Sequence, residues 1–325
     1  MSAARFLVLI PTHAHAELLP FAVRSVQAQT RDDLELVVIG DGVDDATRDV
    51  VADLGRDDRR ITFLDRPKSP RTGEAYRHEV LQGSGAQVVT YLCDDDLFLP
   101  DHLEVVDDAL RSVDLVHSMG VRVSPEGGFD LEWSNLGVDS QRERELAGTS
   151  LVGLTGTAHT AEAYHRLPFG WRSTPTGRFT DHYMYEQFLA DPTCTVSSLF
   201  ALTALRFPDS VRRSMSMAER RAELARWSGR LQDPAGCAGV VAEALASLYR
   251  SGVEHVELAR GASAMSEELE RSVTVLRAEV DATRAELDDV RRELAAAGDE
   301  RRAIEATATW RARAKVLALL RRSAH

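Results

Sequence analysis

The sequence predicts an α/β protein with a mostly parallel β-sheet that is covered by helices on both faces. Over residues 5–115, short apolar runs of β type alternate with segments whose apolar side chains recur at helical spacing. Short loops join these segments, and Asp, Gly or His stands close after most of the apolar runs. Ligands of parallel sheets bind at the carboxyl ends of the strands, so these loops are the predicted site.

The expected elements follow one another regularly along the chain. Strands are expected at 6–10, 34–39, 61–64, 88–92 and 115–123. Helices are expected at 16–29, 45–54, 72–81, 100–110, 181–189, 217–231 and 238–250. Asp44 or Asp45 is suited to cap the second helix, and Pro100 opens the fourth. The stretch 124–215 has a looser pattern, and only its one helix is assigned.

The C-terminal part of the chain has a heptad pattern. Residues spaced alternately four and three apart form its seam: Leu269, Val273, Leu276, Val280, Thr283, Leu287, Val290 and Leu294. This seam predicts a coiled coil over 261–298, closed by Gly298, that either joins two chains or folds back on its own domain. We therefore expect a globular domain over 1–215, a helical accessory segment over 216–260, the coiled coil, and a basic amphipathic tail over 299–325. The tail either contacts anionic lipid or remains a solvated or partner-binding helix.

The composition is that of a soluble globular protein, since 44% of the 325 residues are hydrophobic and 28% are charged. The net charge of −12 argues against nucleic acid as a partner. The three cysteines are scattered and have neither a disulfide framework nor zinc-type spacing. Neither a secretory signal nor a membrane-spanning run is present in the sequence, so we expect a cytoplasmic protein whose membrane contact is at most peripheral.

Three adjacent carboxylates, Asp94, Asp95 and Asp96, follow the apolar stretch 88–93. Three acids at the end of a buried strand repel one another and are costly to desolvate, so a cation should offset their charge. Mg²⁺ and Mn²⁺ prefer oxygen ligands, and an ion held by one or two carboxylates usually completes its shell with water and substrate phosphates. The run therefore predicts a divalent cation and a phosphate-bearing substrate.

Four motifs together resemble family-2 glycosyltransferases with the GT-A fold. They occur in the family's order and spacing: 6–13 (FLVLIPTH), 36–47 (LVVIGDGVDDAT), 73–78 (GEAYRH) and 93–100 (CDDDLFLP). The resemblance covers residues 5–110, and it implies a nucleotide-sugar donor together with Mn²⁺ or Mg²⁺. A UDP-sugar is the first expectation for the donor, with GDP- and TDP-sugars open. The acceptor stays unknown, because acceptor segments carry no transferable code.

The resemblance also implies roles for particular residues. The nucleotide-site candidates are Pro11, Thr12, His13, Asp41, Arg77 and Asp94. Asp95 is the expected direct ligand of the metal, with Asp96 beside it and His182 as a residue that could complete the metal shell. Two positions depart from the family pattern: the second turn is Gly40-Asp41-Gly42, and Cys93 stands where another acid is usual.

An inverting transfer also needs a carboxylate base on the opposite face of the sugar. Asp181 is the first candidate, because it follows the Gly170-Trp171 turn at an expected helix start, where the family has an acidic motif. Glu186 is the second choice, and His159 is a weaker candidate for the site. Each assignment has a structural alternative: the Asp run and Asp181 could be helix caps, Asp41 could be a turn residue, and the histidines could be buried core residues.

Two other functions remain open on the sequence. One is a sugar-phosphate nucleotidyltransferase, although residues 11–15 (PTHAH) lack the Gly-rich basic loop of those enzymes. The other is a non-catalytic scaffold, in which a degenerate domain binds nucleotide and the coiled coil recruits partners. The departures from the family pattern at Gly40 and Cys93 leave this scaffold function as an alternative.

Overall fold

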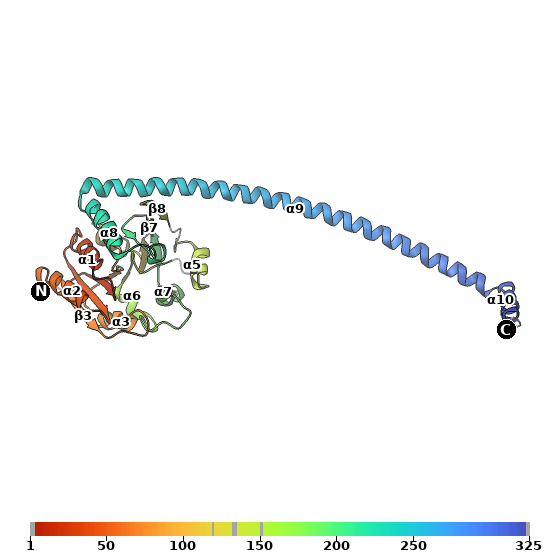
Figure 1. Ribbon diagram of the computed structural model, residues 1–325, viewed down its shortest axis with the longest axis horizontal. Coiled ribbons are helices and arrows are strands. Elements are labelled where there is room, and N and C mark those ends of the chain that lie inside the picture. Colours follow the sequence, from red (N-terminus) through yellow and green to blue (C-terminus); the bar gives the residue numbers. More distant parts are fainter. Residues whose placement is uncertain (1–3, 119, 132–134, 150–151, 323–325) are drawn as a thin grey trace. The chain divides into compact units, whose positions relative to one another are not determined.

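Figure 1 shows the computed structural model, which describes residues 4–118, 120–131, 135–149 and 152–322. The chain divides into two units, Met1–Arg250 and Ser251–His325. In the described part of the chain, no helix is both long and apolar enough to cross a membrane.

A seven-stranded sheet forms the centre of the first unit, with the order β10-β6-β9-β4-β1-β2-β3. Its strands are β1 (Phe6–Thr12), β2 (Leu34–Asp41), β3 (Ile61–Arg66), β4 (Val88–Tyr91), β6 (Leu115–Ser118), β9 (Thr157–Thr160) and β10 (Val196–Leu199). All neighbours pair in parallel except β9, which is antiparallel to β4 and to β6. The predicted α/β class with a mostly parallel sheet is confirmed.

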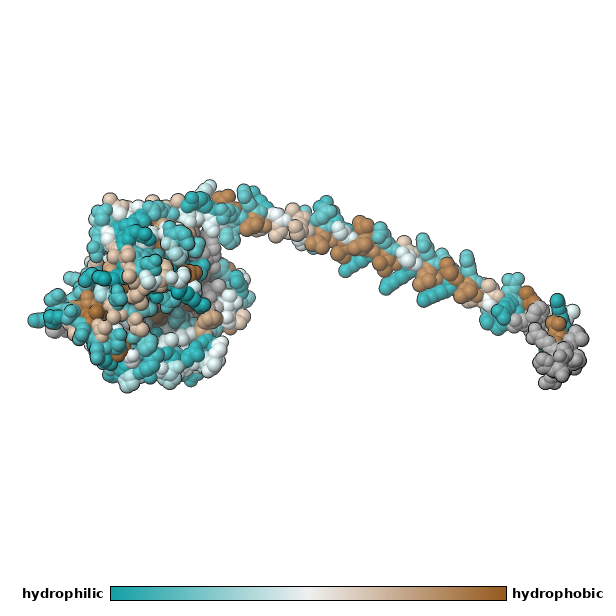
Figure 2. Space-filling model, viewed as in Figure 1, coloured by the Kyte–Doolittle hydropathy of each residue, from teal (hydrophilic) through white to brown (hydrophobic). Residues whose placement is uncertain are grey.

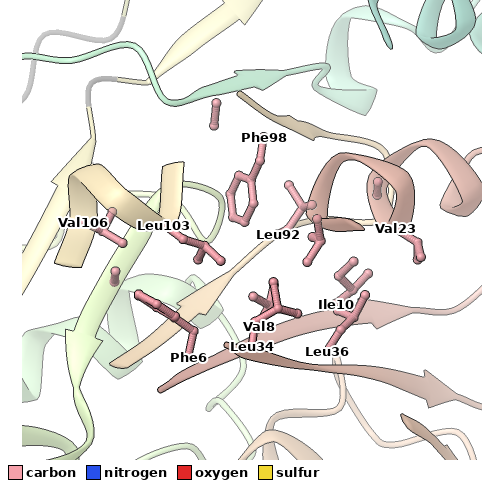
Figure 3. Close-up of a cluster of buried hydrophobic side chains, with 14 of the residues drawn as sticks. Phe6, Val8, Ile10, Val23, Leu34, Leu36, Leu92, Phe98, Leu103 and Val106 are labelled. Atoms are coloured by element: carbon pink, nitrogen blue, oxygen red, sulfur yellow. The ribbon is translucent and has the colours of Figure 1, made fainter. Parts of the chain in front are cut away.

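Both faces of this sheet are buried, as the uninterrupted apolar run of β1 requires. Phe6, Val8 and Ile10 point into one hydrophobic cluster, and Leu7 and Leu9 into another on the opposite face. Figure 3 shows the first cluster, in which β1 and β2 meet side chains from the flanking helices. The helices around the sheet are α1 (Leu19–Gln27), α2 (Asp45–Asp57), α3 (Glu74–Gly83), α4 (His102–Ala109), α6 (Ala161–Arg166) and α7 (Thr180–Ala190).

A second sheet of four short strands has the order β5-β11-β7-β8. Its strands are β5 (Leu97–Phe98), β11 (Ala204–Arg206), β7 (Val121–Val123) and β8 (Phe129–Leu131), and the helix α5 (Asp139–Leu146) follows β8 in the chain. The prediction of one strand over 115–123 was therefore wrong. The chain leaves the large sheet after Ser118, and Val121 pairs with β8 and β11 instead.

The helices after the sheets are longer than the sequence predicted. The 3-10 turn η1 (Asp209–Val211) leads to α8 (Met217–Gln232), whose Leu224 and Trp227 pack on the second sheet. Then α9 (Pro234–Ala306) runs without interruption, and α10 (Ala308–Arg322) ends the described part. Gly298 was expected to end the helix, and this was wrong. A glycine inside a helix costs only about 1 kcal/mol, and the alanines at 295–297 favour helix strongly.

Candidate active site

A cavity of about 610 Å³ opens where β1, β2 and β4 end. The parallel register brings these ends together, because Thr12 of β1 lies beside Gly40 of β2 and Leu9 lies beside Tyr91 of β4. The predicted residues that line the cavity are Pro11, Thr12, His13, Asp41, Arg77, Asp94, Asp95 and Asp181. Four other predicted residues, Asp96, His159, His182 and Glu186, do not line it.

Asp41 fixes one wall of the cavity. Its carboxylate accepts from Lys68 Nζ at 2.5 Å and from the backbone N–H of Ser69 at 2.5 Å, and its backbone oxygen lies 2.8 Å from His13 Nδ1. Gly42 has a φ of 70°, and a Cβ added there would lie 2.6 Å from the Cβ of Lys68. The close approach needs a glycine, so the turn after β2 is built to hold the loop that carries Lys68 against Asp41.

The three adjacent aspartates have different partners. Asp94 Oδ1 lies 2.9 Å from His15 Nδ1, and this hydrogen bond raises the pKa of His15. Asp95 accepts from Arg220 of α8 at 2.8 Å, and Arg220 also binds Asp209 at 2.6 Å. Asp94 and Asp95 therefore face the cavity with side-chain partners that a ligand could replace.

Asp96 is held by the framework instead. One of its carboxylate oxygens accepts from the Thr155 hydroxyl at 2.5 Å, and the other accepts from the backbone N–H of Phe207 at 2.7 Å. Burial raises its pKa, while Arg206 and these two hydrogen bonds oppose that shift. The contacts tie the acidic loop to β11 and to the segment before β9.

The charge of the cavity fits a divalent cation. Burial raises the pKa of Asp95 well above its usual range, and the neighbouring Asp96 and Asp94 raise it further. Donor atoms of His15, Asp94 and Asp95 lie within 4.8 Å of one another, and so do those of Cys93, Asp95 and Asp96. The first set consists of one nitrogen and two carboxylates, which suits Mn²⁺ or Mg²⁺.

The second set fits a hard ion less well. Burial raises the pKa of the Cys93 thiol well above its usual value, so it stays protonated and is a poor ligand. Asp96 already uses both of its oxygens in hydrogen bonds.

Arg77 and Asp181 lie on the same cavity wall. Arg77 is 3% exposed, and its Nε and Nη1 have no hydrogen-bond partner among the residues that the structure describes. Its guanidinium lies 4.8 Å from the ring centroid of Trp171, which in turn donates to the hydroxyl of Tyr91 at 2.9 Å. A buried guanidinium with free N–H groups beside a cavity is a ready anion-binding group.

Asp181 is a carboxylate with an elevated pKa. Burial raises it, while the positive charges of Arg77 and Arg206 oppose that shift. It is the second residue of α7, and it contributes to the lining of the cavity together with Thr180 and Leu154. A group of this kind can take a proton from a hydroxyl bound in the cavity.

The alternative candidates have other partners. Glu186 forms an ion pair with Arg178, one contact of which is 3.0 Å long. His182 Nε2 lies 2.5 Å from the backbone oxygen of Glu145, and its other nitrogen lies 3.2 Å from Arg178. Buried His159 lies 2.7 Å from the hydroxyl of Tyr91, and burial lowers its pKa to about 4.

The residues at the cavity that were not predicted include His15, Lys68, Arg71 and Asp209, and also Arg220, which contacts Asp95. A local signal exists for His15, which stands two residues after His13, and for Lys68, which follows the third strand. Arg220 lies in a surface-type helix pattern, 125 residues from its partner Asp95, so nothing in its neighbourhood identifies it.

An acidic cavity with a buried arginine in its wall, at the carboxyl edge of a mostly parallel sheet, is the arrangement expected of the GT-A class. The chain matches the model of glycosyl transferase family 2 over residues 7–169, half of its length, and it belongs to that family. The predicted family and GT-A fold are thereby confirmed.

Two curated relatives match parts of the chain. One is a GalNAc(5)-diNAcBac-PP-undecaprenol beta-1,3-glucosyltransferase of Campylobacter jejuni, 29% identical over 137 residues, which are 42% of this chain and 44% of the relative. The other is an uncharacterized glycosyltransferase of Nostoc sp., 30% identical over 115 residues, which are 34% of each chain. The chain thus matches less than half the length of either relative.

Two solved structures are similar at low sequence identity. S. aureus TarS 1-349 in complex with UDP-GlcNAc is 14% identical, with a TM-score of 0.49 and coverage of 76% of this chain and 73% of that one. The mannosyltransferase PcManGT from Pyrobaculum calidifontis in complex with GDP-Man and Mn²⁺ is 18% identical, with a TM-score of 0.48 and coverage of 80% and 79%.

Proposed function

We propose that this protein is a metal-dependent, inverting glycosyltransferase that moves a sugar from a nucleotide-sugar donor to an acceptor hydroxyl. One observation carries the proposal: a single cavity holds the buried guanidinium of Arg77, two nitrogens of which have no partner among the described residues, a set of cation ligands and a carboxylate with a raised pKa. These are the three groups that a sugar transfer from a diphosphate requires.

The donor would lie along the edge formed by β1, β2 and β4. Thr12 and Asp41 stand where the nucleoside is expected, and the buried hydroxyl of Thr12 has no protein partner in the described part of the chain. Arg77 would donate to an oxygen of the diphosphate or of the transferred sugar. Asp94 and Asp95, with His15, would hold Mn²⁺ or Mg²⁺, which neutralises charge on the diphosphate when bound.

Asp181 would act as the base. Its carboxylate takes the proton of the acceptor hydroxyl, the hydroxyl oxygen bonds to the anomeric carbon, and the bond between that carbon and the diphosphate oxygen breaks. Attack from the face opposite the leaving group inverts the anomeric centre. Asp181 is favoured over Glu186 because it lines the cavity, whereas Glu186 is bound to Arg178.

The donor and acceptor are proposed by class. We expect a UDP-sugar as donor. A lipid-linked sugar is the first acceptor to test, because the relative from C. jejuni is named for one. We further propose that the exposed seam of α9 joins two copies of the chain, and that the basic tail contacts anionic lipid. Flotation with vesicles that contain anionic lipid, compared for the full chain and for residues 1–298, tests the lipid contact.

A donor screen tests the proposed activity. Nucleotide sugars are added with and without Mn²⁺, and both the melting temperature and the release of nucleoside diphosphate are measured. We expect at least one donor to raise the melting temperature and to be hydrolysed slowly, in both cases more with Mn²⁺. Binding of nucleotide without any turnover would support the scaffold instead, and the absence of binding to every donor would overturn the proposal.

A further inference from the structure

The helix α9 carries a stripe of exposed apolar side chains. Figure 2 shows brown hydrophobic residues recurring along this helix among teal hydrophilic ones. The seam residues are well exposed, from 41% at Val273 to 74% at Leu294. A stripe of this length on a solvated helix is costly unless another helix covers it. The whole seam, from Leu269 to Leu294, lies within the single helix α9, which extends beyond it at both ends.

The types of residue in the first half of the seam favour two parallel strands. In heptad terms Val273 and Val280 occupy a positions, and Leu269 and Leu276 occupy d positions. A β-branched residue at a with leucine at d is the combination that packs well in parallel two-stranded coiled coils. The later positions have the reverse order, with Leu287 and Leu294 at a and Val290 at d, and Thr283 is polar, so the preference for two strands comes from the first half of the seam.

The charges beside the seam select the direction of pairing. Glu279 and Glu286 lie at g positions, while Arg284 and Arg291 lie at e positions five residues further on. In a parallel pair in register, position g of one helix faces the following position e of the other, so each glutamate meets an arginine. In an antiparallel pair g faces g and e faces e, so glutamates would meet glutamates and arginines would meet arginines.

The local ion pairs leave these charges available. Arg271, Arg292 and Arg302 each bind an acid three residues earlier on their own helix. Among the described residues of α9, Glu279, Arg284 and Glu286 form no such pair, and Arg291 has one exposed contact of 3.3 Å with Asp288.

We propose that a second copy of this chain covers the seam as a parallel, in-register, two-stranded coiled coil. Its register is set by ion pairs between Glu279 of one copy and Arg284 of the other, and between Glu286 and Arg291 in the same manner. This inference rests on the proposed self-association and is independent of the proposed transferase activity. Because residues 1–250 precede the seam in the chain, the two copies of that unit join the coiled coil at its amino-terminal end.

Charge reversal in the full chain tests the ion pairs. We expect E279R/E286R and R284E/R291E each to raise the dissociation constant of the dimer by roughly tenfold or more, because attraction becomes repulsion. The variant that carries all four substitutions restores the opposite charges and should dimerise like the unaltered chain. E267R/D281R is the matched control, since it makes the same change of charge at outward positions and should have little effect. Sedimentation equilibrium measures all four.

A single cysteine tests the direction. Leu276→Cys lies at a d position, so a parallel pair in register brings the two thiols together, and mild oxidation should give a covalent dimer. Ala285→Cys, on the outward face, and the unaltered chain with its three native cysteines report the background. A monomeric unaltered chain would overturn the self-association. A dimer that ignores charge reversal and fails to cross-link through Leu276→Cys would overturn the parallel register. Either result would leave the donor screen unaffected.

Discussion

The carboxylates that the sequence singled out fall into two groups, those that line the cavity and those that lie outside it, and the surroundings of the two groups differ. Asp95 and Asp181 face the cavity, where burial raises the pKa of each. Glu186, beyond the cavity, is satisfied by a full ion pair with Arg178. Both carboxylate oxygens of Asp96 also have fixed hydrogen-bond donors, which are the Thr155 hydroxyl and the backbone N–H of Phe207.

The difference separates reactive carboxylates from structural ones. A carboxylate that is desolvated and whose partners can be exchanged has affinity left for a proton or a cation. A carboxylate with fixed hydrogen-bond donors on both oxygens has little affinity left for a proton or for a cation. The sequence alone cannot make this distinction, because all four residues are acids and their partners come from other parts of the chain.

The largest expected effect comes from Asp181→Asn. If Asp181 is the base, turnover should fall by about 10²- to 10⁴-fold, the usual contribution of a positioned proton acceptor. Donor affinity, measured by calorimetry in the presence of Mn²⁺, should stay the same. Glu186→Gln is the matched control, since it removes an acid from the same helix and should change turnover little. Similar losses in the two variants would contradict the assignment.

The pH profile gives a second measure of the same group. The base acts only when deprotonated, so turnover should fall as the pH drops through the pKa of Asp181. Burial raises this pKa, and the acidic limb should therefore lie above the ordinary value of about 3.9 for aspartate. A limb at or below the ordinary value would assign the base to another residue.

The next effect concerns Asp95 and Asp96. Asp95→Asn should weaken Mn²⁺ binding by roughly tenfold or more, as seen by electron paramagnetic resonance titration, because a charged ligand is lost. Asp96→Asn should instead lower the free energy of unfolding by about 1–2 kcal/mol, since its contacts to Thr155 and Phe207 are structural. If Asp96→Asn removes Mn²⁺ binding and leaves stability intact, the second donor set with Cys93 is the metal site.

Much of the first unit could be predicted from the sequence for a physical reason. The strands β1, β2 and β4 are largely apolar runs, and predicted site residues stand at or just after the end of each, so local patterns indicate both fold and site. The second sheet was not predicted, because its strands have two or three residues each, and its pairings other than that between β7 and β8 join segments far apart in the chain. Strands of this length are too short to show an alternation of apolar and polar residues in the sequence.

The site shows the same limit. Asp94, Asp95 and Asp41 could be found because their motifs are contiguous, whereas the partners that decide their state come from elsewhere. Arg220 reaches Asp95 from α8, and Thr155 reaches Asp96 from the loop before β9. Which acid in a run of three faces a cavity depends on these long-range contacts, so the run alone predicted ligands, and only the family resemblance singled out Asp95 as the direct one.

The smallest expected effect concerns Arg220, the exchangeable partner of Asp95. It tests most directly the comparison between carboxylates that face the cavity and carboxylates that the framework holds. Arg220 binds both Asp95 and Asp209, and its guanidinium takes a carboxylate oxygen that a cation would use. Arg220→Met should tighten Mn²⁺ binding by about threefold to tenfold, because an ion pair whose two side chains are only 11% and 12% exposed no longer competes for the carboxylate. Arg221→Met on the same helix is the control, because Arg221 is exposed and forms no ion pair in the described part of the chain.

The direction of that change decides what Arg220 does. Tighter Mn²⁺ binding would mean that the arginine stands in for the cation in the free protein and must leave before the cation binds. Weaker binding would mean that it holds Asp95 in the orientation that the cation needs, and Asp95 would then belong with Asp96 among the carboxylates fixed by the framework. Adding UDP to the titration separates a third role. If Arg220 moves to the diphosphate, Arg220→Met should weaken UDP binding even as Mn²⁺ alone binds more tightly.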